Sequence, residues 1–128
     1  MTTKQFEVFV HDKPGEVARL AEILAKNAVN IRGISTDLGG AKPVIHVITD
    51  DEASARKVLK ANGMEFCEKE ILIISMSDKP GELAKITRKL AKAGVNVESM
   101  FILGQKIPEV QVAVGVDQRE RAQDLLLK

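Results

Sequence analysis

The chain has 128 residues, of which 45% are apolar and 29% are charged, and its formal net charge is +1. This composition is typical of a globular protein and excludes a disordered or membrane-embedded chain. Because the net charge is small and the chain has four Phe but no Trp or Tyr, it lacks the basic surface and aromatic rings typical of nucleic-acid-binding proteins. We therefore expect no nucleic-acid partner.

The cysteine content and the first residues suggest a cellular setting. Cys67 is the only cysteine, so no disulfide can form within the chain, which suits a reducing compartment. The N-terminal MTTKQFEVFV has no basic segment followed by an apolar stretch, and the longest apolar run, Ile71–Ile74, is too short to cross a bilayer. We expect a cytoplasmic protein with no membrane contact.

The first half of the chain predicts five elements in order. They are a strand at 5–10, an amphipathic helix at 15–27, strands at 30–38 and 44–49, and a weaker helix at 51–60. A short strand at 64–69 follows and runs through Glu70 into the second half. Asn27 is the expected end of the first helix.

The second half repeats this pattern. Alignment of residues 12–31 with residues 78–97 gives eleven identities in twenty positions, including DKPGE in both copies, so the chain is an internal duplication. The repeat predicts a strand at 71–76, a helix ending near Gly94, strands at 96–103 and 109–116, and a helix at 118–127. The counterpart of the 64–69 strand would lie beyond Lys128.

Each copy thus has the order strand, helix, strand, strand, helix, strand. The predicted fold class is α+β, with two tandem ferredoxin-like βαββαβ units at 1–69 and 70–128, antiparallel sheets and helices on one face. The second unit lacks its last strand. An unpaired sheet edge promotes aggregation, so we expect another strand or a partner to cover it.

Residues suited to catalysis or metal binding are few. His11 and His46 have no neighbouring Cys or His at ligand spacing, and no phosphate-binding loop or nucleophile motif occurs. Cys67 is interpreted as a small strand residue. We expect no enzyme activity, no metal and no cofactor.

The DKPG turn stands between a strand and a helix in both copies. Asp12 is expected to cap the helix, Pro14 to occupy its first turn, and Gly15 to let another group approach the backbone. The N–H groups of Gly15, Glu16 and Val17 would then suit a small carboxylate. On turn chemistry alone, a well-made helix start without any ligand is the favoured interpretation.

The βαββαβ pattern, the DKPG turn and the "AVNI" or "GVNV" entry to the second strand resemble the ACT domain. The resemblance covers nearly the whole chain as two copies, and the DKPG turns look like those in the regulatory part of aspartokinases. ACT domains are regulatory modules that bind amino acids where two units pair. The resemblance implies a non-catalytic sensor of a small amino acid that acts as a homodimer.

Carried onto this sequence, the resemblance implies ligand contacts from the two turns and from the asparagine that enters each second strand. The residues are Asp12, Pro14, Gly15, Glu16 and Asn30 in the first copy, and Asp78, Pro80, Gly81, Glu82 and Asn96 in the second. Two alternatives stay open: a regulatory subunit of a biosynthetic enzyme, of the acetolactate synthase small-subunit type, and an interaction scaffold that binds no ligand.

Overall fold

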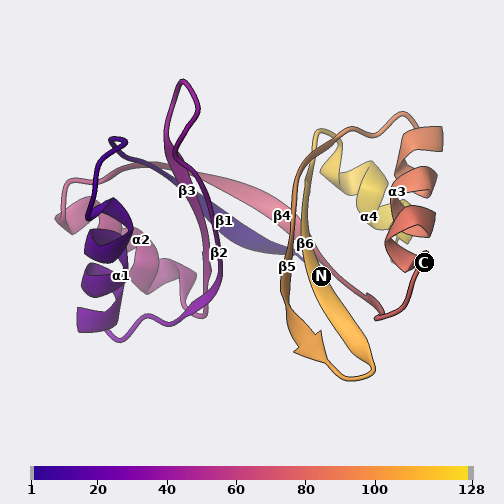
Figure 1. Cartoon of the computed structure of the whole chain (residues 1–128), viewed down its shortest axis with the longest axis horizontal. Helices are drawn as coiled ribbons and strands as arrows, with labels where there is room; N and C mark the ends of the chain where they lie inside the picture. The colour runs from indigo at the N-terminus through magenta and orange to yellow at the C-terminus, as the bar shows by residue number, and fades with distance from the viewer. Residues whose placement is uncertain (1, 127–128) are drawn as a thin grey trace. The chain divides into compact units, whose positions relative to one another are not determined.

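The computed structural model describes residues 2–126 and contains six strands and four helices (Figure 1). The elements in chain order are β1 (Thr2–Phe9), α1 (Glu16–Lys26), β2 (Ile31–Asp37), β3 (Val44–Thr49), α2 (Glu52–Ala61), β4 (Glu65–Ser77), α3 (Glu82–Lys92), β5 (Val97–Lys106), β6 (Glu109–Val116) and α4 (Arg119–Leu126). This order confirms the predicted pair of βαββαβ units, with the predicted strands at 64–69 and 71–76 joined into the single strand β4. Leu127, which the sequence places in the last helix, lies outside the described residues.

The described chain divides into two compact units. The N-terminal unit is Lys4–Lys69, and the C-terminal unit begins at Glu70 and also includes Thr2 and Thr3. The boundary falls inside β4, so one continuous strand contributes its first part to one unit and its remainder to the other.

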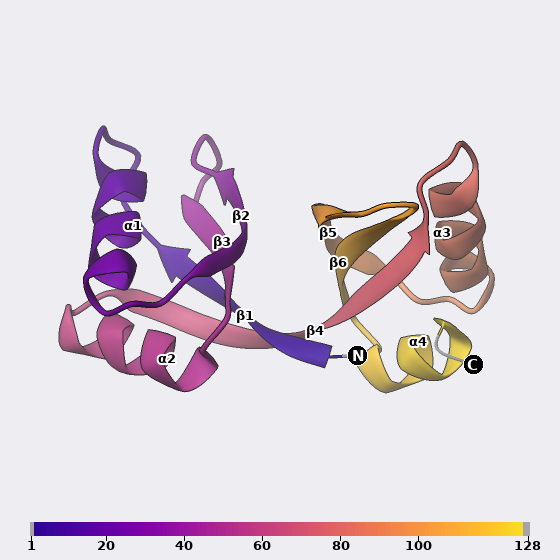
Figure 2. The ribbon, with the colours of Figure 1, turned by 90° about the horizontal axis from the view of Figure 1, so that it is seen from below.

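In the N-terminal unit the strand order is β2-β3-β1-β4. β3 is antiparallel to both of its neighbours. Val8 of β1 lies opposite Ile45 of β3, and Ile34 of β2 lies opposite Val47 of β3. Both helices of this unit, α1 and α2, lie on the same side of the strands (Figures 1 and 2). The connection between β2 and β3 is a loop that includes Gly39 and Gly40.

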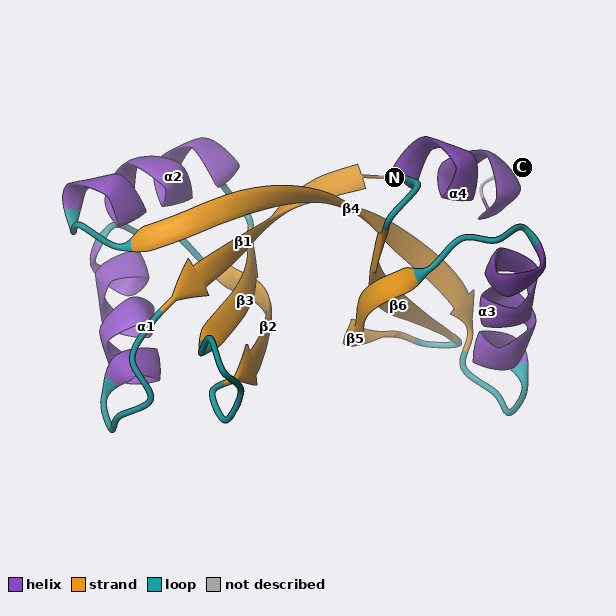
Figure 3. Cartoon of the chain, turned by 90° about the horizontal axis from the view of Figure 1, so that it is seen from above, coloured by secondary structure: helices purple, strands orange, loops and turns teal. Residues whose placement is uncertain are grey.

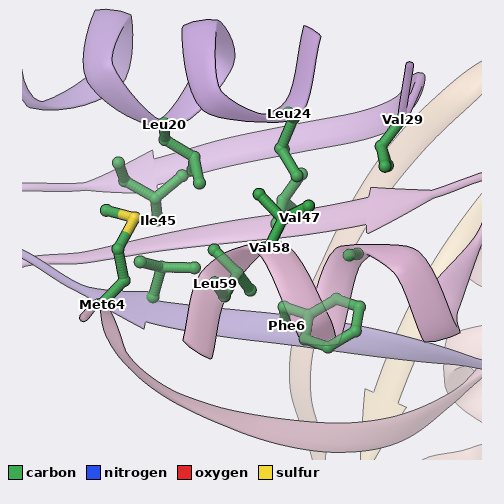
Figure 4. Close-up of a cluster of buried hydrophobic side chains, with 11 residues drawn as sticks. Phe6, Leu20, Leu24, Val29, Ile45, Val47, Val58, Leu59 and Met64 are labelled. Carbon is green, nitrogen blue, oxygen red and sulfur yellow. The ribbon is translucent and has the colours of Figure 1, made fainter. Parts of the chain in front are cut away.

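The core of the N-terminal unit fills the layer between these helices and the sheet (Figure 4). Alternate residues of the strands point into it, and helix residues spaced by four meet them, which is the pattern that an amphipathic helix and a half-buried strand produce. The fully buried members are Phe6, Val8, Leu20, Leu24, Ile45, Val47, Ala55 and Leu59. Phe6 also meets the ring of Phe66 edge-on, with centroids 5.9 Å apart.

In the C-terminal unit the strands follow the order β4-β6-β5, and both pairs are antiparallel. Leu72, Leu90 and Val114 are fully buried in its core. Among residues 2–126 no strand follows α4. Thr2 and Thr3, at the start of β1, belong to this unit, so it does receive strand residues from elsewhere in the chain.

The two copies end their first helix in the same way. Val29 N–H donates to Leu24 O and Val95 N–H donates to Leu90 O, both at 2.9 Å, and in each copy the residue before the valine is left-handed. That residue is Gly94 with φ of 74° in the second copy but Ala28 with φ of 57° in the first. Asn27 is the C-cap of α1, as expected, but the left-handed position one residue later is occupied by an alanine.

None of the helices within residues 2–126 combines the length and the apolar character that spanning a membrane requires.

Candidate functional site

Each unit contains one DKPG turn, drawn as a loop between a strand and a helix in Figure 3. Gly15 and Gly81 are the N-cap residues of α1 and α3, with φ of 94° and 92°. These left-handed angles strain any residue that carries a Cβ, so the turn itself requires glycine. No atom lies within 4 Å of a Cβ built at either position, so the backbone here is open to an approaching group.

The prediction that the aspartate of the turn caps the helix is wrong. Neither helix has a side-chain cap hydrogen bond, and Asp12 and Asp78 are exposed. In each copy the lysine after the aspartate donates its N–H to the carbonyl oxygen two residues before it, at 3.0 Å. This extra tight turn delays the helix start, so Pro14 and Pro80 precede the cap instead of occupying the first helical turn.

Backbone N–H groups at both helix starts are available to a ligand. Within residues 2–126, no protein acceptor meets the N–H groups of Glu16 and Val17 in α1 or of Leu83 in α3, whereas Glu82 N–H donates to Lys79 O at 3.4 Å. The first N–H groups of a helix have no partner within the helix and lie at the positive end of its dipole. They can therefore bind a carboxylate.

The glutamate of DKPGE has a different environment in each copy. Glu16 is only 4% exposed, and its Oε1 accepts a hydrogen bond of 3.3 Å from the backbone N–H of His11, two residues after the end of β1. Glu82 lies nearer the surface and pairs with Lys85, with 2.9 Å between Oε2 and Nζ. The Lys85 ammonium lowers the pKa of the Glu82 carboxyl by donating this hydrogen bond.

A cavity of about 370 Å³ opens beside the second DKPG turn. Asp78, Lys79, Glu82 and Leu83 form its wall on the side of the turn and the helix. The sheet supplies the other wall. The residues of that second wall are Met76, Ser77, Met100, Phe101, Ile102, Val110 and Val112. Of the predicted second-copy residues, the cavity brings together Asp78 and Glu82.

The Asp78 carboxylate at this cavity is held in place by the β5–β6 hairpin. Its Oδ2 accepts a hydrogen bond of 2.6 Å from Gln105 Nε2, and the Asp78 backbone N–H donates to Pro108 O at 3.1 Å. A carboxylate has about four lone-pair positions, so Asp78 can still accept hydrogen bonds from an ammonium group. The sequence analysis missed Gln105 because its side chain reaches the turn only through the pairing of β5 with β6.

The first DKPG turn borders a smaller and more polar pocket of about 210 Å³. Its lining includes the charged side chains of Glu16, Arg19 and Glu65, together with His11. Of the predicted first-copy residues, only Glu16 lines it. The two turns therefore share a sequence but face different surroundings.

Asn30 and Asn96 do not lie beside the turn of their own unit. Each follows the last turn of an eleven-residue helix whose first turn adjoins DKPG, a separation of about 16 Å along the helix. Their backbone N–H groups donate to Asp50 Oδ1 and Asp117 Oδ1, both at 2.9 Å, and the aspartate N–H groups donate back to the asparagine carbonyls. The sequence analysis missed these aspartates, although one follows the third strand in each copy.

A separate polar group of side chains lies on the strands of the N-terminal unit. Gln5 Nε2 and His46 Nδ1 are 3.2 Å apart, and Cys67 Sγ donates to Glu7 Oε2 at 3.3 Å. Partial burial and the Glu7 carboxylate raise the pKa of the Cys67 thiol above its usual value. A raised pKa disfavours the thiolate, so this cysteine is a poor nucleophile. No cluster of three or more potential metal ligands occurs among residues 2–126.

Comparison with known families decides the assignment. The model of the ACT domain pair family matches residues 1–128. The chain belongs to the ACT domain pair family. This confirms the predicted resemblance, and ACT domain pairs are regulatory rather than catalytic modules.

Solved structures agree with the ACT fold. Protein BT0572 from Bacteroides thetaiotaomicron superposes with a TM-score of 0.90 at 26% identity, covering 99% of this chain and 88% of that one. The regulatory subunits of aspartate kinase from Thermus thermophilus and Thermus flavus give TM-scores of 0.68 and 0.67 at 17% and 20% identity. They cover 98% of this ACT domain pair and 88% and 90% of their own chains. No curated protein sequence matches the chain significantly.

Proposed function

We propose that this ACT domain pair is a regulatory sensor that binds a free amino acid at the start of α3. The observation that carries the proposal is the cavity of about 370 Å³ beside the second DKPG turn, whose lining includes the Asp78 carboxylate, Lys79 and Leu83 with its unpartnered N–H group. Pockets for small ligands have about this size or more and combine an apolar lining with a few polar groups.

The polar end of the cavity suits both charged groups that every amino acid carries. The ligand carboxylate would accept a hydrogen bond from the N–H of Leu83, at the positive end of the α3 dipole. The ligand ammonium would donate to Asp78, whose carboxylate Gln105 already orients. Lys79 and Glu82 also line this end of the cavity, so their side chains are close enough to contact the charged groups of the ligand as well.

Binding can act as a signal because it stabilises whichever conformation or assembly presents the closed cavity. We propose that this assembly is a homodimer of a cytoplasmic protein, in which a second copy covers the open side of the cavity. An enzyme of amino-acid biosynthesis would be the regulated partner. Light scattering of the purified protein with and without ligand tests the dimer, and affinity purification tests the enzyme partner.

The direct test is a melting-temperature screen against the twenty amino acids. Because the chain has no Trp or Tyr, the melting is followed by far-ultraviolet circular dichroism or an external dye. We expect at least one amino acid to raise the melting temperature, and Asp78→Asn to reduce that shift more than Asp12→Asn in the first turn. A shift that neither Asp78→Asn nor Gly81→Ala reduces would place the ligand elsewhere.

A further inference from the structure

The cavity beside the second DKPG turn has one polar end and one apolar end. The polar end is formed by the turn and the start of α3. Away from it, the walls are apolar: Met76 from β4, Leu83 from α3, Ile102 from β5 and Val112 from β6. Apart from Ser77, the side chains of the sheet wall are apolar and offer a polar ligand side chain little hydrogen bonding, so the two ends can recognise different parts of one ligand.

Two residues of the apolar end are unusually exposed for their type. Ile102 is 68% exposed and Leu83 is 46% exposed, although both lie on the cavity wall. Apolar surface that a ligand removes from water contributes to affinity in proportion to its area. A ligand with an apolar side chain would gain from covering these two residues, whereas an ionised side chain would lose hydration there without any compensating partner.

The first copy shows that the apolar end is not simply a by-product of the fold. Ile102 pairs with Val112 across β5 and β6, and the equivalent cross-strand pair in the N-terminal unit is Thr36 with Ile45. Thr36 is thus the counterpart of Ile102, sixty-six positions earlier, and places a hydroxyl where the second copy has a larger apolar group. The pocket beside the first turn is lined by other residues, and neither Thr36 nor Ile45 is among them.

We propose that the cavity of the C-terminal unit selects amino acids with an uncharged aliphatic or thioether side chain, such as leucine, isoleucine, valine or methionine. This inference rests on the proposed function and adds the ligand class and the choice of unit. The ligand side chain lies against Ile102, Leu83 and Val112, while its charged groups contact the turn. Each buried methylene contributes about fourfold to affinity, so leucine binds on the order of tenfold or more tighter than alanine.

The test is isothermal titration calorimetry of the whole chain with leucine, methionine, alanine, lysine and aspartate. We expect leucine or methionine to bind most tightly and lysine and aspartate not to bind. Ile102→Thr introduces the residue found in the first unit. We expect it to weaken leucine binding about five- to tenfold and to reduce the ratio of the leucine affinity to the alanine affinity. The matched control is Thr36→Ile, which lies outside the cavity and leaves every affinity unchanged.

The outcomes separate the inference from the function on which it rests. If lysine or aspartate binds more tightly than leucine, the sensor function stands and the apolar selectivity is wrong. If none of the twenty amino acids binds, both are wrong. If Ile102→Thr lowers leucine and alanine affinity equally, or if Thr36→Ile has the same effect, selectivity does not arise in this cavity.

Folding of the variants is checked by circular dichroism before titration. Because Ile102 is mostly exposed, its replacement by threonine should leave the unliganded melting temperature nearly unchanged. Should Ile102→Thr nevertheless fail to fold, Leu83→Val makes the equivalent change on the helix side, since the first copy has Val17 at that position. Leu83→Val should also lower the preference for leucine over alanine, and an unaltered preference overturns the inference.

Discussion

Ala28 allows a direct test of how much a left-handed backbone conformation destabilises the end of α1. It has φ of 57°, in the left-handed region, and its counterpart in the second copy is Gly94 with φ of 74°. The hydrogen bonds around the two residues are equivalent, so the copies differ at this position mainly in the presence of a Cβ. A left-handed residue with a Cβ is destabilised by roughly 1–2 kcal/mol relative to glycine.

Ala28→Gly removes this strain but gives the unfolded chain more conformational freedom, which costs about 0.4–1 kcal/mol. The net expectation is a gain of roughly 1 kcal/mol in the free energy of unfolding. Gly94→Ala should lose a similar amount. With a urea slope of about 1–3 kcal/mol per molar, each change moves the denaturation midpoint by roughly 0.5 M, in opposite directions.

The assay is urea denaturation followed by far-ultraviolet circular dichroism, since the chain has no Trp or Tyr to report by fluorescence. The matched control is Ala25→Gly, because Ala25 is an exposed alanine with helical geometry in the last turn of α1, three residues before Ala28. It should lose about 0.5–1 kcal/mol of stability. If Ala28→Gly lowers the midpoint as Ala25→Gly does, the left-handed strain is not a significant term and the reasoning fails.

Three further predictions follow from single contacts. Asp117→Ala removes the acceptor that holds the entry to β5, and we expect a loss of about 1 kcal/mol in urea denaturation, with Asp117→Asn less damaging. The Arg56 guanidinium donates a hydrogen bond of 2.7 Å to Glu68 and lowers the pKa of that carboxyl below its ordinary 4.5. The ion pair therefore stabilises the fold above pH 4.5, and this stabilisation is lost as the pH falls through the lowered pKa. Thus Glu68→Gln should lower the melting temperature at pH 7 but match the parent protein at pH 2–3. Cys67 should react with iodoacetamide at pH 7.5 more slowly than a free thiol, and Glu7→Gln, which removes one cause of the raised pKa, should speed the reaction; equal rates would contradict the role of that carboxylate.

The sequence was sufficient to predict the fold because the same pattern occurs twice. The periodicity of Leu20 and Leu24, for example, recurs in Ile86 and Leu90, so each helix prediction supported the other. The edges of the elements were less accurate. β1 begins at Thr2 instead of Gln5, because alternating burial in a strand is a weaker signal near a chain end.

The site was predictable only in part, because local chemistry and long-range pairing contribute to it separately. The role of the glycines in the turns and the available N–H groups could be predicted from the DKPG residues alone. The capping role of Asp12 did not, since an additional tight turn before Gly15 displaces the helix start by a few residues. The cavity walls depend on which residue of β5 lies opposite Val112, and this strand register cannot be predicted from the local sequence.

The shared strand β4 has a practical consequence for dissecting the protein. Its thirteen residues run from Glu65 to Ser77 without a loop, so the boundary between Lys69 and Glu70 is not a linker at which a protease could release one unit intact. A fragment starting at Glu70 would also lack Thr2 and Thr3, which are grouped with the C-terminal unit although they stand at the opposite end of the sequence. Expression as two separate halves should therefore give poorly folded products. Domain-by-domain binding studies will be more informative with point variants in the full-length chain.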